Sequence, residues 1–182
     1  MAIVDPSITW RPLEERLAHT SDARHRQVLE VVIEHMKEEA KPDLDGLMRT
    51  LAPNPAYHFW NEGCDVGPKT TEGVRSYYAE FVQSQSNVLE FEIDRLLVDD
   101  TGLMTEGYLR QVYPGSYAAQ LGLQIDDPDD DYLIEFRQLI VWPVDSDGKI
   151  VGEDSYHSGP SRIEKLTADQ LPDQYVEMRS GR

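Results

Sequence analysis

Residues 70–94 read TTEGVRSYYAEFVQSQSNVLEFEID, and the spacing of the apolar residues changes within this stretch. Apolar side chains recur every three to four positions from Val74 to Val82, which predicts an amphipathic helix capped by Thr70 or Thr71. Apolar and acidic residues then alternate from Leu89 to Asp94, which predicts a strand with one buried face. A helix followed directly by alternating strands is typical of the α+β class.

The chain before this stretch predicts two more helices and one strand. Apolar residues recur at helical spacing up to a stop at Pro42, and Thr20 or Ser21 is placed to cap that helix. A shorter helix is expected over residues 44–51, before a series of prolines. Residues 56–60, AYHFW, are too short for a helix and dense in aromatics, which favours a strand.

The chain after this stretch predicts the rest of a meander. In order, we expect a turn at 99–102, a strand at 103–113, an insertion at 114–131 with one helical turn, a strand at 132–142, a turn at 145–148, a strand at 149–157 and a closing helix at 167–178. Residues 1–19 have two prolines and a weak apolar pattern, so we expect an N-terminal arm with one helical turn, followed by a single domain over residues 20–182.

Three N-terminal helices and a meander of long strands predict a specific α+β architecture. Because strands twist, such a sheet curls around the helices. We therefore expect a cone-shaped barrel of curved, mixed or antiparallel sheet wrapped around the three helices. Its open mouth would suit a small apolar ligand.

The charge balance excludes several classes of partner. The 182 residues include 34 acids and 17 Lys or Arg, which gives a formal net charge of -17. This balance disfavours nucleic acid and anionic membranes. The apolar runs are too short to span a bilayer, and the N-terminus lacks a secretory pattern, so we expect a cytoplasmic protein. Cys64 is the only cysteine, which excludes an internal disulfide and a Cys-rich zinc site.

The order of elements over residues 20–160 and two local patterns resemble the nuclear transport factor 2-like superfamily, which includes ketosteroid isomerase, scytalone dehydratase and polyketide cyclases. Residues 71–78, TEGVRSYY, look like its G-x-x-x-I-R-x-F-Y helix, and residues 147–150, DGKI, look like its turn before the last strand. The resemblance implies a cofactor-independent pocket and a homodimer or higher homo-oligomer. It selects no activity, because this fold hosts isomerases, dehydratases, cyclases, lyases and binding modules.

His58 is the first candidate for a catalytic base. It lies among Tyr57, Phe59 and Trp60, and desolvation by aromatic rings favours the neutral imidazole that a base requires. The resemblance to ketosteroid isomerase places a base at residues 58–61, although that base is an Asp. A histidine instead leaves room for a dehydratase-like or lyase-like dyad with an Asp. The alternative is a histidine hydrogen-bonded at the rim of the core.

The last predicted strand offers an acidic residue on either face. Asp154 shares one face with Ile150 and Tyr156, whereas Glu153 shares the other with His157. The resemblance to ester cyclases implies an acid or base on this strand, and Asp154 is our candidate. If the other face lines the cone, Glu153 and His157 are inside instead. A solvated acidic strand edge is the simpler alternative.

Two strands in the middle of the sheet carry candidates for holding a developing oxyanion. Tyr108 and Arg110 lie on one face of their strand, and their phenol and guanidinium could stabilise negative oxygen. Ion pairing across the convex face, for example between Arg110 and Glu135, explains the charged residues without function. The candidates for substrate binding are Tyr57, Trp60, Tyr78, Glu135, Trp142 and His157, with core packing as the alternative for the aromatic ones.

No metal and no nucleotide cofactor is expected. The sequence lacks a His-Glu-x-x-His motif and a phosphate-binding glycine loop, and Cys64 lies beside acids that disfavour its thiolate. Together these features predict a cofactor-independent acid and base enzyme, a lyase, dehydratase or isomerase, acting on a hydrophobic, aromatic or polycyclic small molecule. The alternatives are a non-catalytic module that binds an apolar ligand in the cone and an assembly domain with a packed cone.

Overall fold

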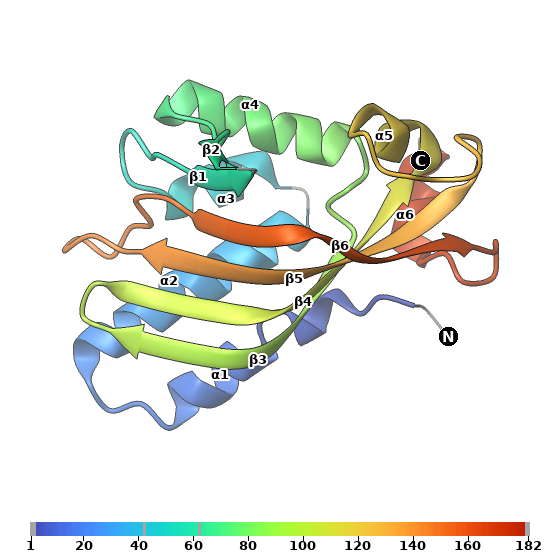
Figure 1. Cartoon of the computed structure of the whole chain (residues 1–182). Helices are drawn as coiled ribbons and strands as arrows, with labels where there is room; N and C mark the ends of the chain where they lie inside the picture. Colours follow the sequence, from blue (N-terminus) through green and yellow to red (C-terminus); the bar gives the residue numbers. More distant parts are fainter. Residues whose placement is uncertain (1–2, 42, 62, 181–182) are drawn as a thin grey trace.

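The computed structural model describes residues 3–41, 43–61 and 63–180. Its elements, in chain order, are η1 (Pro6–Ile8), α1 (Arg11–Ala18), α2 (Ala23–Ala40), α3 (Leu44–Thr50), β1 (His58–Asn61), β2 (Cys64–Asp65), α4 (Thr70–Gln83), β3 (Leu89–Asp99), β4 (Gly102–Pro114), α5 (Gly115–Gln120), β5 (Asp131–Pro143), β6 (Asp154–Leu166) and α6 (Asp173–Arg179) (Figure 1). None of these helices combines the length and the hydropathy that crossing a bilayer requires.

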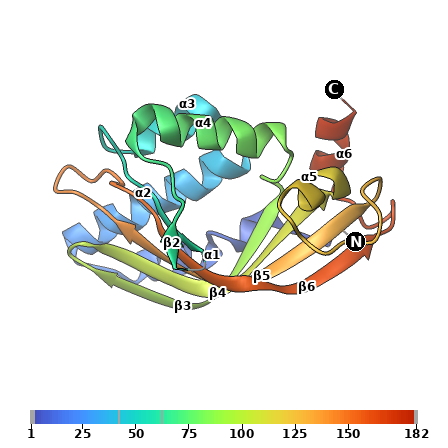
Figure 2. The same cartoon turned by 45° about the horizontal axis from the view of Figure 1, so that its top comes forward.

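Six strands form one curved, mixed sheet in the order β2-β1-β6-β5-β4-β3. Strands β3 to β6 pair antiparallel with their neighbours, while β1 runs parallel to β6. Helices α2, α3 and α4 lie over the concave side of this sheet (Figure 2). The expected α+β class and the curled sheet are confirmed. The sheet is open, because its edge strands β2 and β3 do not pair with each other, so it forms a cone without closing into a barrel.

The helices bury one stripe each against this sheet. Helix α2 is capped by Asp22, whose side chain accepts from the backbone N of His25, rather than by the expected Thr20 or Ser21. The N-terminal segment is more helical than one turn, since it forms η1 and the whole of α1. Leu13 of α1 is 0% exposed and lies in the main core. A short helix with one fully buried side chain leaves little periodic signal in a sequence.

The end of the sheet away from α3 is covered on both faces. Val112 and Tyr113 are neighbours on β4, so their side chains point to opposite faces. Tyr113 packs in a cluster with Ala118 of α5, and Val112 packs in a cluster with Tyr175 of α6. The expected helical turn in the insertion is therefore α5, and the expected closing helix is α6. Together they extend the packed core beyond the three helices α2, α3 and α4.

The last strand begins later than the sequence predicts. Residues 149–153 are irregular, and Ile150 bridges to Leu51 and Val144. The Ile150 backbone N donates to the carbonyl of Thr50 at 3.0 Å, and its carbonyl accepts from Ala52 at 2.8 Å. These bonds hold the stretch against the chain that follows α3. Strand β6 then runs on beyond the predicted end, to Leu166.

Candidate active site

A cavity of about 510 Å³ lies between the concave face of the sheet and helices α2, α4 and α5. Nine aromatic side chains line it, namely Phe59, Trp60, Tyr77, Phe81, Phe91, Tyr113, Tyr117, Phe136 and Trp142. Its exposed lining residues, which include Trp60, Val66, Leu121 and His157, mark the mouth. The volume falls in the range of about 300 to 1,000 Å³ that small-ligand sites occupy. An assembly domain with a packed cone does not fit this cavity.

The start of β6 presents alternate residues to the cavity. Glu153, directly before β6, and Ser155 and His157 of β6 line it, whereas Asp154 and Tyr156 do not. Asp154 was the candidate acid or base, and its assignment is wrong for the cavity. The reason is the irregular stretch before β6. Ile150 is buried in the core and Glu153, three residues later, faces the cavity, so simple alternation from Ile150 fails.

Glu39 of α2 and Glu153 are two carboxyl groups facing the same cavity. Burial raises the pKa of Glu39 to about 7. Burial, and next the negative charges of Glu39 and Asp154, raise the pKa of Glu153 to about 8. Among the described residues, no Lys, Arg or His nitrogen lies within ion-pair distance of either carboxylate. Burial of both groups, and for Glu153 also the charge of Glu39, favours the protonated form, so the pair keeps a proton near neutral pH.

Sequence reasoning missed Glu39, although a signal for it exists. Val32 and Met36 belong to the buried stripe of α2, and Glu39 follows Met36 by three positions on the same face. The adjacent Glu38 made the end of this helix look like a solvated acidic face. An acid that continues an apolar stripe is unusual, because burial of an unpaired carboxylate is costly. That exception is the feature to search for in a sequence.

His58 does not line the cavity. Phe59 and Trp60 of the same strand do, with Trp60 at the mouth, whereas the imidazole of His58 lies beside Asp65 and Lys69. The His58 side chain is 39% exposed, and its Nδ1 lies 2.7 Å from Oδ2 of Asp65. Lys69 Nζ reaches the same carboxylate at 2.9 Å, and hydrogen bonds from Lys69 and then His58 hold the pKa of Asp65 below its ordinary value. The expectation of an imidazole among aromatic walls is therefore wrong.

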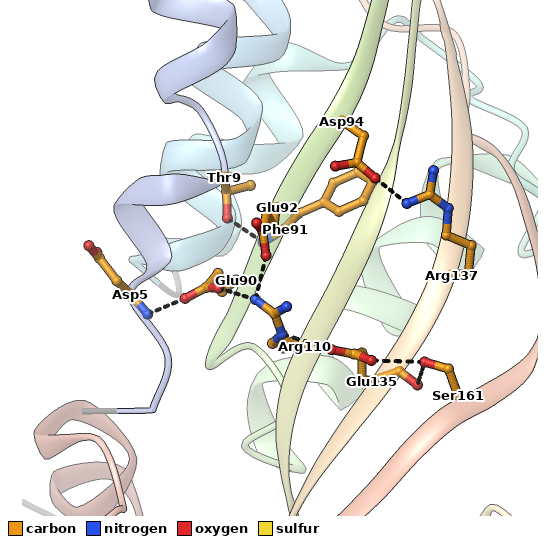
Figure 3. A network of polar contacts seen from close by, with 10 residues as sticks. All are labelled: Asp5, Thr9, Glu90, Phe91, Glu92, Asp94, Arg110, Glu135, Arg137 and Ser161. Carbon is orange, nitrogen blue, oxygen red and sulfur yellow. Dashed lines mark hydrogen bonds and ion pairs between the residues drawn. The ribbon is translucent and has the colours of Figure 1, made fainter. Parts of the chain in front are cut away.

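Tyr108, Arg110 and Glu135 lie on the convex face and do not line the cavity. Arg110 bridges three acids, with Nη1 at 2.7 Å from Glu90 and 2.8 Å from Glu92, and Nε at 2.9 Å from Glu135 (Figure 3). The guanidinium of Arg137 lies over the ring of Tyr108, 4.8 Å from its centre. Cross-strand ion pairing, the alternative to an oxyanion site, accounts for these residues.

The same network ties the N-terminal segment to the edge of the sheet. Glu90 Oε2 accepts from the backbone N of Asp5 at 2.8 Å (Figure 3). The hydroxyl of Thr9 accepts from the backbone N of Phe91 at 3.0 Å. β3 is an edge strand, and such contacts cover an edge that would otherwise pair with another chain.

We expect Arg110→Met to destabilise the fold by about 2 kcal/mol, because it leaves Glu90 and Glu135 without a counter-charge. Their side chains are only 9% and 13% exposed. Urea unfolding measures the change. Arg95→Met is the matched control, since Arg95 is 63% exposed in its pair with Glu106 and should change stability little. Equal losses in the two variants would contradict a structural role that is specific to Arg110.

Tyr57 and Tyr78 are buried behind the cavity wall rather than in contact with its space. Their hydroxyls are 2.9 Å apart, and Tyr78 also lies 3.0 Å from Nε2 of His35. His35 Nδ1 lies 2.7 Å from the hydroxyl of Thr50, which donates to the carbonyl of Leu47. Of the aromatic candidates, Trp60 and Trp142 do line the cavity, as does His157 at its mouth.

One surface group could coordinate a metal ion. Asp22, His25 and Asp100 each offer a ligand atom, and these atoms lie within 4.8 Å of one another. Asp22 caps α2, and Nε2 of His25 lies 3.3 Å from Asp100 Oδ1. Capping and ion pairing account for the group. None of the three lines the cavity, and Cys64 is exposed elsewhere on the surface.

Solved structures share this arrangement of helices and sheet. A protein assigned as a SnoaL-like polyketide cyclase from Shewanella putrefaciens CN-32 matches with a TM-score of 0.60 at 9% identity, over 86% of this chain and 90% of that one. A nuclear transport factor 2-like protein from Anabaena variabilis matches with a TM-score of 0.54 at 13% identity, over 77% and 94%. The chain has the nuclear transport factor 2-like fold.

An LEH-like epoxide hydrolase from M. tuberculosis shares the nuclear transport factor 2-like fold with this chain, with a TM-score of 0.53 at 15% identity over 72% of this chain and 83% of that one. No protein-family model and no curated protein sequence matches the chain. At identities this low, the likeness establishes the fold and leaves the activity to be argued from the cavity.

Proposed function

We propose that the protein is a cofactor-independent acid and base enzyme that acts on a hydrophobic small molecule in this cavity. The observation that carries the proposal is the pair Glu39 and Glu153, two carboxyl groups without a cationic partner in a cavity walled by aromatic rings. Titratable groups with shifted pKa values in a concave apolar site are typical of acid and base catalysis. The reaction class remains a lyase, dehydratase or isomerase.

The two carboxyls would divide the chemistry between them. Near neutral pH, the pair holds about one proton, and Glu39 ionises first since its pKa is the lower, about 7 against about 8. Ionised Glu39 takes a proton from a carbon beside a carbonyl group. Protonated Glu153 gives its proton to the carbonyl oxygen as negative charge develops there. Return of a proton to another carbon completes an isomerisation, and loss of a leaving group completes an elimination.

The lining offers further support for this chemistry. Tyr77 lies in the cavity wall, and burial raises its pKa well above the ordinary value, so its phenol stays a hydrogen-bond donor. The amide of Gln138 donates to the hydroxyl of Ser155, and Ser155 in turn hydrogen-bonds to Glu153. The solved structures of the same fold include proteins named for polyketide cyclase and epoxide hydrolase chemistry, both reactions of small molecules.

Exchange of α-protons in β-tetralone tests the proposal without knowledge of the natural substrate. This bicyclic ketone needs only a base and an acid to exchange its α-hydrogens with deuterium oxide, which proton NMR follows. We expect the protein to catalyse the exchange, and Glu39→Gln to lower the rate by about 100-fold, because a positioned base contributes that much. The rate should rise with pH through the pKa of Glu39, about 7.

Two matched variants separate catalysis from a change in fold. Glu34→Gln removes an exposed carboxyl from the same helix, and Glu72→Gln removes an exposed one from α4 that does not line the cavity. Both should keep the wild-type rate. If Glu39→Gln exchanges β-tetralone as fast as these controls while the ketone still binds, the alternative of a non-catalytic ligand-binding module replaces the enzyme.

A further inference from the structure

The charges in the cavity wall are one-sided. Three glutamates, Glu39, Glu80 and Glu153, line the cavity, and no Lys or Arg is among the lining residues that the structure describes. His157 at the mouth is the one basic side chain among them. An anionic ligand would find no counter-charge here. The chain as a whole carries a formal net charge of -17, which attracts cations to its surface.

The acids are combined with an apolar, aromatic wall. The faces of aromatic rings attract cations, most strongly where water is excluded, and quaternary ammonium ions are bound in proteins by such groups of rings. Rings approach the cavity from β1, β3, β4, β5, α4 and α5. Glu153 is 9% exposed, and the only side-chain hydrogen bond to it among the described residues comes from the neutral hydroxyl of Ser155, with no Lys, Arg or His nitrogen in an ion pair with its carboxylate.

We propose that the ligand of this cavity is a hydrophobic amine or quaternary ammonium ion, whose cationic nitrogen lies between Glu39 and Glu153 with its apolar part against the rings. A neutral ligand would leave the ionised carboxylate of the pair without a counter-charge, whereas a cationic nitrogen supplies the counter-charge that the chain itself does not provide. The inference rests on the proposed function for the assignment of the cavity as the working site, and it adds the chemical class of the substrate.

Binding of a cation should displace protons from the site. The acidic groups that face the cavity are Glu39 from α2, Glu80 from α4 and Glu153 directly before β6, with Asp154 adjacent on the outer side. The other titratable lining groups are His157 and the phenols of Tyr77, Tyr113 and Tyr117. A permanent cation favours the ionised form of every nearby carboxyl. Its affinity should therefore rise with pH from about 5.5 to about 8.5 as the pair gives up its protons.

Three probes of one shape and different charge test the proposal. These are the naphthylmethyltrimethylammonium ion, its neutral isostere neopentylnaphthalene, and the anion naphthylacetate. Binding to the whole protein is followed by quenching of tryptophan fluorescence, since Trp60 and Trp142 line the cavity, and by calorimetry in two buffers to count released protons. We expect the cation to bind about 10-fold or more tightly than the neutral isostere at pH 8.5, with protons released, and naphthylacetate to bind weakest.

Variants of the two carboxyls test whether Glu39 and Glu153 cause the preference for the cation. The double variant Glu39→Gln and Glu153→Gln should lose the preference for the cation and keep its affinity for the neutral isostere, while Glu34→Gln on the exposed side of α2 should keep both. A neutral probe that binds as tightly as the cation at pH 8.5 overturns the proposal and leaves the cavity as a site for neutral substrates. Failure of all three probes to bind overturns this proposal, while the exchange of β-tetralone decides the proposed function separately.

Discussion

Glu153→Gln should make the protein more stable at alkaline pH and leave its stability near pH 5 almost unchanged. In the folded protein the pKa of Glu153 is about 8, against an ordinary value of 4.5. Between these two values the unfolded chain has released a proton that the native state still holds. The free energy of unfolding therefore falls as the pH rises from 4.5 to 8, and is constant above.

The size of the effect follows from the shift. One pKa unit corresponds to about 1.4 kcal/mol, so the substitution should stabilise the fold by roughly 3 to 5 kcal/mol above pH 8. Glutamine keeps the size of the side chain and carries no charge to desolvate. Urea unfolding at about pH 5 and about pH 8.5 measures the difference, and Glu34→Gln, on the exposed side of α2, serves as the control. A variant with the same pH dependence as the wild type would show that the carboxyl is hydrated and the cavity wet.

This predicted gain in stability has a functional meaning. A side chain whose removal stabilises the fold is retained against its own cost, which is typical of active sites. The same reasoning applies to Glu39, whose folded pKa is about 7. Its carboxyl makes the free energy of unfolding fall further as the pH rises from 4.5 to 7. Two such groups in one cavity are harder to explain as packing than either group alone.

The fold could be predicted from the sequence because its signals are local. The change from helical to alternating spacing at residues 83–89 places the end of α4 and the start of β3. The hairpin turn from Asp99 to Gly102 then places β4 beside β3. These patterns depend on a few adjacent residues. The late start of β6 could not be predicted, since the bonds between Ile150 and the chain after α3 join residues about a hundred positions apart.

The site could be predicted only in outline. An aromatic cavity in a curled sheet follows from the fold, and Trp60, Trp142 and His157 line it, while their role in substrate binding stays a prediction. The roles given to His58 and Asp154 failed because each depended on which face of a strand turns inward. A short strand such as β1 does not reveal its face, and one irregular residue reverses the alternation. The homo-oligomer and the cytoplasmic location stay predictions, since a single chain tests neither.

His35→Leu should destabilise the protein by about 3 to 5 kcal/mol, the largest loss that we expect from one substitution. His35 is 0% exposed, and burial lowers its pKa to about 3, so the ring is neutral. The Thr50 hydroxyl gives its proton to the Leu47 carbonyl at 2.6 Å and must accept from Nδ1 of His35. Nε2 is then an acceptor for the Tyr78 hydroxyl, which in turn accepts from Tyr57.

Every donor in this chain has one acceptor, so removal of the ring leaves the buried Tyr78 hydroxyl without an acceptor for its proton and the Thr50 hydroxyl without the donor that it accepts from. The double variant His35→Leu and Tyr78→Phe removes one of these orphaned groups and should therefore be destabilised by less than the sum of the two single variants. If the loss of stability in the double variant equals the sum of the losses in the two single variants, water enters and replaces the imidazole.

The pH dependence of His35→Leu supplies an independent check. Because the folded protein keeps His35 neutral down to about pH 3, while an unfolded histidine gains a proton below its ordinary pKa of 6.5, this residue makes wild-type stability rise with pH over that interval. The variant lacks this slope, so its deficit should shrink from pH 7 to pH 4.5. Glu153 acts in the opposite direction above pH 4.5. The buried histidine thus stabilises the wall of the cavity at the neutral pH where the carboxyl pair inside it holds one proton and is ready to exchange it.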